Sequence, residues 1–301
     1  MENGYALNIT GLDDKMDSGI PDKHIVLLTG TPGTMKSTLA YYILYNHAKN
    51  HDVKSLYLTL EQEKDGFLFH LNKLGLGDPN PNIRLFDMST TREQWMKLSQ
   101  NKITQVKEVL PDANCGSCEY KGCLDYATAV VTSGEATNLC VPGGEEVHEK
   151  VASIMGVDTS SPEVKEKASK NKDLETFKRQ LQTLKNVIDF KLLVIDSLPV
   201  IEMMFRMQSP RDDLFHFFKW LKKLGGTTFL ISEMSQDSQS YSRHDIDFLA
   251  DGIIKLSLYQ QNPTTVQRHI QIAKMRGVDH TTDPFVIRYT GSEFEAMKVL
   301  M

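Results

Sequence analysis

The segment from Gly30 to Ser37, which reads Gly-Thr-Pro-Gly-Thr-Met-Lys-Ser, constrains the fold of this chain more than any other feature. It matches the phosphate-binding pattern G-x-x-x-x-G-K-[ST] at every fixed position except the second glycine, which is Met35. An apolar run from His24 to Thr29 precedes it, and a segment suited to a helix, Ser37 to Asn46, follows. Backbone N–H groups at such a helix start, together with the helix dipole, bind polyphosphates. The sequence therefore predicts nucleotide binding, although the loop taken alone also fits an ordinary strand-to-helix turn.

Individual residues of this loop have distinct predicted roles. Lys36 would contact the β and γ phosphates, and the Ser37 hydroxyl would hold Mg²⁺. Met35 stands where glycine is usual, so its side chain either crowds the loop or requires unusual backbone torsion angles. We predict that the phosphate-binding residues are Gly30, Thr31, Pro32, Gly33, Thr34, Met35, Lys36, Ser37 and Thr38.

Two acidic residues follow apolar strands and supply the chemistry that the loop lacks. Asp196 ends a run of four apolar residues, as expected of a buried parallel strand, and could hold Mg²⁺ directly or through water. Glu61 ends an alternating strand that begins at Leu56, and we predict that it is the general base that polarises the attacking water. The alternatives are that Asp196 caps the next turn and that Glu61 precedes a helix starting at Lys64, where acids complement the helix dipole.

Further segments resemble the KaiC-like branch of the RecA superfamily of P-loop ATPases. The resemblance covers most of the chain outside one insertion, and it implies an α/β fold with a mostly parallel, twisted sheet flanked by helices and a strand-rich C-terminal segment. Gln62 replaces the second acid of the family's usual glutamate pair. The matching segments are Thr10 to Asp14, Gly19 to Pro21, Leu58 to Glu61, Phe229 to Glu233, Ala250 to Ile254 and Lys274 to Gly277.

The resemblance also implies site residues, cofactors and an assembly. Ser232 and Glu233 would sense the γ-phosphate, and Lys274 and Arg276 would reach the ATP of a neighbouring subunit. ATP and Mg²⁺ would be the cofactors, and the assembly would be a homo-oligomeric ring such as a hexamer. A cation supplied by a neighbour stabilises the charge that develops on the terminal oxygens during phosphoryl transfer.

We predict a slow, regulatory ATPase that acts with a protein partner that the sequence does not identify. Autophosphorylation is disfavoured, because Asp247 and Phe248 stand where the family's autokinase domain carries its phosphorylated pair. One alternative is a recombinase-like, DNA-binding ATPase, and another is a nucleotide-binding scaffold with little hydrolysis. The net charge of -5 and the aspartates in and near the loop Ser235 to Ser242 argue against nucleic acid as a partner.

A charged, helix-prone insertion from residue 91 to residue 189 interrupts a single ATPase domain that spans residues 1–301. Its apolar spacing predicts helices at 91–110 and 163–185. All four cysteines lie between them: Cys115, Cys118, Cys123 and Cys140. Four thiolates suit a zinc ion and an iron–sulfur cluster equally, and His148 could replace Cys140 as the fourth ligand. Free or redox-active thiols are the alternative.

The composition is that of an ordinary soluble globular protein. Of 301 residues, 40% are hydrophobic and 24% are charged. The N-terminus shows no signal peptide, and the most apolar run contains Asp196, Pro199 and Glu202. We therefore expect a cytoplasmic protein without a membrane partner.

Overall fold

The computed structural model describes residues 4–77, 80–87, 100–133, 135–155, 172–205, 209–234, 241–242, 244 and 246–299. The chain divides into two compact units, one formed by residues 1–89 with 190–301 and the other by residues 90–189. Most of the loop Ser235 to Ser242, and the first nine residues of each predicted helix in the insertion, lie outside the described residues.

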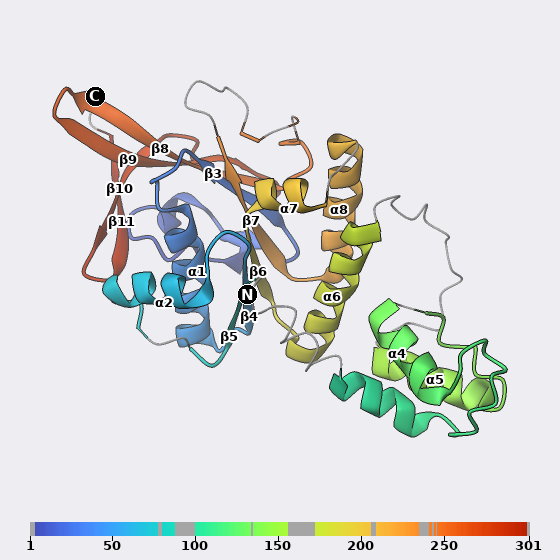
Figure 1. The fold of residues 1–301 in the computed structure, drawn as a ribbon. Coiled ribbons are helices and arrows are strands. Elements are labelled where there is room, and N and C mark those ends of the chain that lie inside the picture. The colour runs from blue at the N-terminus through green and yellow to red at the C-terminus, as the bar shows by residue number, and fades with distance from the viewer. Residues whose placement is uncertain are drawn as a thin grey trace. The chain divides into compact units, whose positions relative to one another are not determined.

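The first unit is built on a nine-stranded sheet with the order β11-β10-β9-β8-β3-β7-β6-β4-β5 (Figure 1). The six strands from β8 to β5 in this order run parallel, and β9, β10 and β11 extend the sheet as antiparallel strands. This arrangement confirms the predicted fold class. The strands are β3 (Ile25–Gly30), β4 (Ser55–Thr59), β5 (Ile83–Asp87), β6 (Leu192–Asp196), β7 (Thr227–Glu233), β8 (Gly252–Asn262), β9 (Thr265–Met275), β10 (Phe285–Thr290) and β11 (Glu293–Lys298).

Helices cover both faces of this sheet, which explains why its central strands are apolar throughout. Val26 and Leu28 of β3 share a buried cluster with residues of α1 and α2, whereas Leu27 between them is buried on the other face. That other face is covered by α7 and α8 (Figure 1). The helices are α1 (Lys36–His51), α2 (Lys64–Lys73), α7 (Leu198–Met204) and α8 (Pro210–Leu224). A small hairpin-like pair, β1 (Gly4–Tyr5) and β2 (Ile20–Pro21), and a short 3-10 helix η1 (Asp13–Lys15) precede the sheet.

Strand pairing places the phosphate loop and the predicted acidic residues at one edge of the sheet. In the parallel register, Gly30 lies beside Glu233, and Thr59 lies beside Asp196. Because parallel strands end at the same edge, the phosphate loop after β3 and the acids after β4 and β6 meet there. The sheet topology thus brings together segments that are far apart in the sequence.

The second unit is helical and contains a small core of its own, to which α6 contributes no residue. A helix at residues 100–109 precedes α4 (Cys123–Ser133), α5 (Gly144–Met155) and α6 (Lys172–Ile188). Val106, Tyr126, Val130 and Val151 form the centre of the core, and Cys123 and Cys140 are buried in the same cluster. Throughout the described parts of the chain, helices long and apolar enough to cross a lipid bilayer are absent.

Candidate nucleotide site and cysteine site

The phosphate loop passes close to other backbone, and this requires glycine at Gly30. A Cβ atom at this position would lie 2.2 Å from the carbonyl oxygen of Leu256 on β8. Gly33 has φ +80°, a backbone conformation that other residues rarely adopt. Thr34 is buried, and its hydroxyl donates to the Thr31 carbonyl at 2.8 Å, which closes the loop on itself.

Met35 adopts the unusual torsion angles expected of a side chain at this position. Its φ of 70° and ψ of 29° lie in the left-handed region, immediately before the first residue of α1. The side chain is partly buried and packs against the main core cluster. Packing of this side chain therefore compensates for a backbone conformation that normally favours glycine.

Two variants of Met35 should separate these opposing effects. Both Met35→Gly and Met35→Ala lose the packing, but only glycine relieves the left-handed strain. We therefore expect Met35→Gly to be more stable than Met35→Ala by about 1 kcal/mol in denaturant unfolding. Equal stabilities of the two variants would show that the positive φ carries no cost here.

Lys36 folds back onto its own loop. Its Nζ donates to the carbonyl oxygens of Gly30 and Thr31, each at 3.0 Å. Burial lowers the pKa of this ammonium, while the nearby carboxylates of Glu233, Asp196 and Glu61 act in the opposite direction. Acids from three different strand ends thus act on the charge of one lysine, and a bound phosphate would replace the loop carbonyls as its partner.

Asp196 is buried at the end of β6 and is hydrogen-bonded by two hydroxyl groups. Tyr57 Oη donates to Asp196 Oδ2 at 2.7 Å, and the Ser37 side chain also bonds to this carboxyl group. Burial raises the pKa of Asp196, and these two hydrogen bonds oppose that rise. The contact between Ser37 and Asp196 joins the two residues predicted to hold Mg²⁺, and both offer the oxygen ligands that this ion prefers.

Tyr57 is a site residue that no sequence motif singles out. It lies on β4, is fully buried, and packs against Phe67 of α2 with ring centroids 4.9 Å apart. Burial and the adjacent Asp196 hold the pKa of its phenol well above the usual value, so it remains a hydrogen-bond donor. Tyr57 therefore fixes the orientation of the Asp196 carboxylate.

Glu61 follows β4 and is exposed, as a residue that contacts water and substrate must be. Its Oε1 accepts a hydrogen bond from Ser197 Oγ, and Ser197 directly follows Asp196. Ser232 is buried near the end of β7, and Glu233 ends that strand beside Gly30. The predicted base and the predicted sensor strand therefore lie on the same edge of the sheet as the phosphate loop.

Lys274 and Arg276 lie at the opposite edge of the sheet from the phosphate loop, where the parallel strands begin. β9 ends at Met275, which is level with Val26 on β3 through the pairing of both strands with β8. Val26 is four residues before Gly30, and at about 3.3 Å per residue this is roughly 13 Å from the start of the phosphate loop. These two cations are thus placed away from the loop of their own chain.

At that edge both cations are anchored to neighbouring backbone. Lys274 Nζ donates to the Ala250 carbonyl at 2.7 Å, and Arg276 Nη2 donates to the Phe248 carbonyl at 2.8 Å. Asp251 pairs with Arg276 at 3.2 Å and with Lys222 at 2.8 Å. Burial opposes ionisation of Asp251, but the bonds from Lys222 and the Ile25 N–H keep its pKa below the usual value.

Arg268 is a second residue that sequence reasoning missed. It pairs with Leu258 on β8, two residues beyond the level of Gly30, so β9 carries it to the phosphate-loop edge. Its Nε donates to the Gly33 carbonyl at 3.3 Å. A cation in contact with the loop can neutralise phosphate charge, but an arginine on an exposed antiparallel strand carries no motif that would reveal this.

The four cysteines line one small cavity in the second unit, together with Pro111, Tyr126 and Pro142. Cys115 is exposed and Cys118 half-buried, whereas Cys123 and Cys140 are buried. A hydrogen bond with Ser117 lowers the pKa of the Cys115 thiol, and burial together with the nearby cysteines raises that of Cys140. A shared cavity lined by four sulfur donors fits a thiolate-ligated group.

His148 is not part of this cavity. Its Nδ1 lies 2.9 Å from Thr137 Oγ1, and Cys140 lines the cavity where a fourth ligand is needed. Among the described residues, three or more His, Cys, Asp or Glu side chains do not converge on one point as the ligands of a single ion. Of the two candidate fourth ligands, Cys140 lines the cavity and His148 does not.

Comparison with known proteins identifies the insertion and the remainder of the chain separately. Residues 110–142, which include all four cysteines, match a family model described as "Putative Fe-S cluster". A stretch of 56 residues is 50% identical to one component of the ion-translocating oxidoreductase complex of Cronobacter sakazakii and covers 19% of this chain and 29% of that protein. The same component in Yersinia pestis is 48% identical over 56 residues, 30% of its length. This chain thus spans less than a third of these relatives.

The larger match covers most of the chain. A crystal structure of a KaiC-like protein from Pyrococcus horikoshii resembles this chain with a TM-score of 0.63 over 98% of this chain and 99% of that chain, at 19% sequence identity. At this identity the likeness shows the fold alone. Residues 6–114 and 145–296 match the family model "ATPase: KaiC", and the chain therefore belongs to the KaiC family of ATPases.

Proposed function

We propose that this protein is a slow, Mg²⁺-dependent regulatory ATPase that works as a homo-oligomeric ring and carries an iron–sulfur cluster in its insertion. One observation carries the catalytic part: the phosphate loop with Lys36 and the strand ends that carry Asp196, Glu61 and Glu233 meet at a single edge of the sheet. ATP binding follows from family membership, and the geometry supports hydrolysis.

Each residue of this edge has a defined task in hydrolysis. Lys36 and the loop N–H groups would bind the phosphates, and Ser37 with Asp196 would hold Mg²⁺, which neutralises charge on the phosphate oxygens. Glu61, held by Ser197, would accept a proton from the attacking water. Gln62 in place of a second acid, together with the strained Met35, supports a slow rate. An autokinase reaction is not part of the proposal.

The position of Lys274 and Arg276 supports completion of the site by a neighbour. Because strand register separates them from their own phosphate loop, they cannot act on a nucleotide bound there. A head-to-tail ring places one face of each subunit against the opposite face of the next. In such a ring, a cation at this edge can reach the terminal phosphate held by the adjacent protomer.

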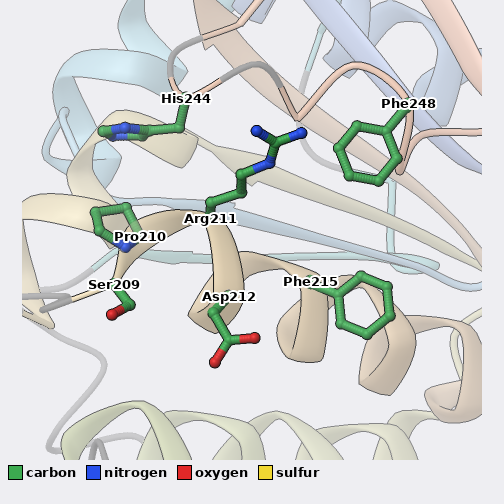
Figure 2. A pocket seen from close by; sticks show the side chains of 7 residues that line it. All are labelled: Ser209, Pro210, Arg211, Asp212, Phe215, His244 and Phe248. Atoms are coloured by element: carbon green, nitrogen blue, oxygen red, sulfur yellow. The ribbon is translucent and has the colours of Figure 1, made fainter.

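An apolar pocket beside these cations supports a subunit contact on the same face. Phe215 and Phe248 are 44% and 49% exposed, and the Arg211 guanidinium lies over the Phe248 ring at 5.3 Å (Figure 2). The Phe248 carbonyl accepts the hydrogen bond from Arg276, which makes the pocket continuous with the cation site. The pocket has a volume of about 550 Å³ and is lined by Ser209, Pro210, Arg211, Asp212, Phe215, His244 and Phe248.

Mixing two inactive variants tests the shared site. Arg276→Ala keeps an intact phosphate loop, and Lys36→Ala keeps an intact cation for its neighbour. Each variant alone should lack turnover. An equimolar mixture should recover up to about a quarter of wild-type phosphate release, because random mixing places an intact phosphate loop beside an intact Arg276 in about a quarter of the shared sites. Mixtures with the double variant Lys36→Ala/Arg276→Ala are the matched control and should remain inactive.

The outcomes distinguish the candidate functions. Mixed oligomers without recovered turnover would refute the shared site. Bound ATP with no turnover in the wild-type protein would instead support a nucleotide-binding scaffold. Retention on single-stranded DNA that weakens with salt would support a recombinase-like function.

The insertion supports an iron–sulfur cluster as its resident group. Four cysteines line one cavity, and the family model that matches residues 110–142 is described by such a cluster. Cys115, Cys118, Cys123 and Cys140 would be the ligands. A bound cluster would supply a centre that can gain or lose one electron.

A further inference from the structure

The backbone of Arg276 is held at the start of β3. Its N–H donates to the Asp251 carbonyl oxygen at 2.9 Å, and its own carbonyl oxygen lies 3.0 Å from His24 Nε2. Asp251 in turn donates its N–H to the Ile25 carbonyl of β3 at 2.8 Å. The sheet therefore fixes the main chain of Arg276, and only the direction of its side chain remains to be set.

Two acceptors set the direction of the Arg276 guanidinium. Nη1 donates to Asp251 Oδ1 at 3.2 Å, and Nη2 donates to the Phe248 carbonyl at 2.8 Å. Among the hydrogen bonds of the described residues, these engage two of the five N–H donors that a guanidinium has, and the Arg276 side chain is 50% exposed. Such a cation can bind the phosphate of another molecule while its own chain holds it in place.

The Asp251 carboxylate is itself fixed in its orientation. Its side chain is only 8% exposed. Oδ2 accepts a hydrogen bond from the Ile25 N–H at 3.1 Å. Oδ1 accepts from Lys222 Nζ of α8 at 2.8 Å as well as from Arg276. Each oxygen of this carboxylate thus has its own partners, with Oδ2 toward β3 and Oδ1 toward the two cations.

A carboxylate satisfies these three donors, whereas an amide of the same shape does not. An amide has one acceptor oxygen, and its other end is an NH2 group that donates. With its oxygen toward the Ile25 N–H, the amide would turn its NH2 group toward the two cations and repel them. The reverse orientation would place the NH2 group against the Ile25 N–H instead. Asp251→Asn therefore releases both cations in the orientation that keeps β3 intact.

We propose that Asp251 is a positioning residue that aims Arg276 at the nucleotide bound by the neighbouring subunit, an inference that rests on the proposed function. A cation that is already oriented stabilises the charge of phosphoryl transfer without reorganisation at the moment of reaction. Asp251 lies level with Ile25, five residues before Gly30, which at about 3.3 Å per residue is roughly 16 Å from its own phosphate loop. A subunit without this carboxylate should thus keep its own ATP site and fail as the cation donor to its neighbour.

Pairwise mixing of full-length variants tests this division of roles. Asp251→Asn alone should bind labelled ATP like the wild type and show a kcat that is lower by about tenfold or more. Mixed with Lys36→Ala, it should recover up to about a quarter of wild-type phosphate release, because its own phosphate loop then meets an intact Arg276. Mixed with Arg276→Ala, it should release no more phosphate than the separate variants, because neither partner supplies an oriented cation.

Two results would overturn the inference. Wild-type turnover by Asp251→Asn would show that Arg276 needs no carboxylate to act. Recovered turnover in the mixture of Asp251→Asn with Arg276→Ala would show that the cation of Asp251→Asn still works. A merely structural role of Asp251 predicts this second result, because Asp251 also bonds to Ile25 at the start of the strand that leads to the phosphate loop.

Lys222 provides a control and a second variant, because it lies on α8 with 43% of its side chain exposed. Lys222→Gln removes the other cation from the same oxygen but keeps the pair of Asp251 with Arg276, so its kcat should stay within a few-fold of the wild type. Lys222→Glu instead brings a second carboxylate beside Asp251 and should draw Arg276 out of position. If Asp251→Asn binds no ATP, Lys222→Glu replaces it in both mixtures, with the same expected and contradicting results.

The mixture of Arg276→Ala with Lys36→Ala separates this inference from the proposed function. If that mixture recovers turnover and Asp251→Asn also rescues Arg276→Ala, the shared site stands and the role of Asp251 is refuted. If that mixture remains inactive, the shared site of the proposed function is itself refuted.

Discussion

Glu61→Gln is expected to hydrolyse ATP on the order of 100-fold more slowly than the wild type and to bind ATP equally well. Glutamine has the same shape and can still accept the hydrogen bond from Ser197, but it cannot take a proton from water. The phosphate loop is unchanged, so nucleotide affinity should persist. Phosphate release under saturating ATP and equilibrium binding of a labelled nucleotide measure the two effects separately.

Glu63→Gln is the matched control for this variant. Glu63 is also exposed, lies two residues along the chain, and loses the same charge, but it contributes no side-chain cap to α2. It should retain turnover within a few-fold of the wild type. Hydrolysis by Glu61→Gln at the wild-type rate would show that another group activates the water.

Cys123→Ser is expected to abolish the iron content and the visible absorption of protein purified without oxygen. Cys123 is buried in the wall of the cavity, and its N–H is fixed by Asn114 Oδ1 at 2.8 Å, so loss of its sulfur removes a ligand that has no substitute nearby among the cavity residues. Serine preserves the side-chain shape, and the fold of the second unit should survive. Metal analysis and ultraviolet–visible spectra provide the measurement.

His148→Ala is the control for the cysteine site. Because this histidine is hydrogen-bonded to Thr137 and does not line the cavity, its removal should leave the spectrum unchanged. Bound zinc without visible absorption in the wild type would contradict the cluster and support the zinc alternative. Unchanged iron in Cys123→Ser would show that Cys123 is not a ligand.

Local sequence patterns predicted much of the fold because they arise from short-range chemistry. The apolar run before Gly30 is β3, and the four apolar residues before Asp196 belong to β6. Even the unusual torsion of Met35 could be anticipated, because a side chain at a glycine position of the loop has few alternatives. In the cysteine segment, spacing alone left both His148 and Cys140 as candidates, and only packing separated them.

Contacts between distant strands could not be predicted in the same way. Tyr57 and Arg268 have no motif, and each acquires its role from a partner that is 139 or more residues away. The separation between the phosphate loop and the two cations, Lys274 and Arg276, depends on the register of β8 and β9 against β3. A single sequence does not specify this register. A shift of a few residues in that register would move both cations toward their own phosphate loop.

The nucleotide chemistry of this protein can be read from its sequence, because a phosphate loop and strand-end carboxylates are local features whose function follows from residue type and spacing. The folded sheet was needed to establish which groups meet: Tyr57 contacts Asp196, Arg268 contacts the phosphate loop, and Lys274 and Arg276 lie at the far end of the strands. Parallel strands bring their ends together through long-range hydrogen-bond pairing, and the pairing partner and register are properties of the sheet as a whole.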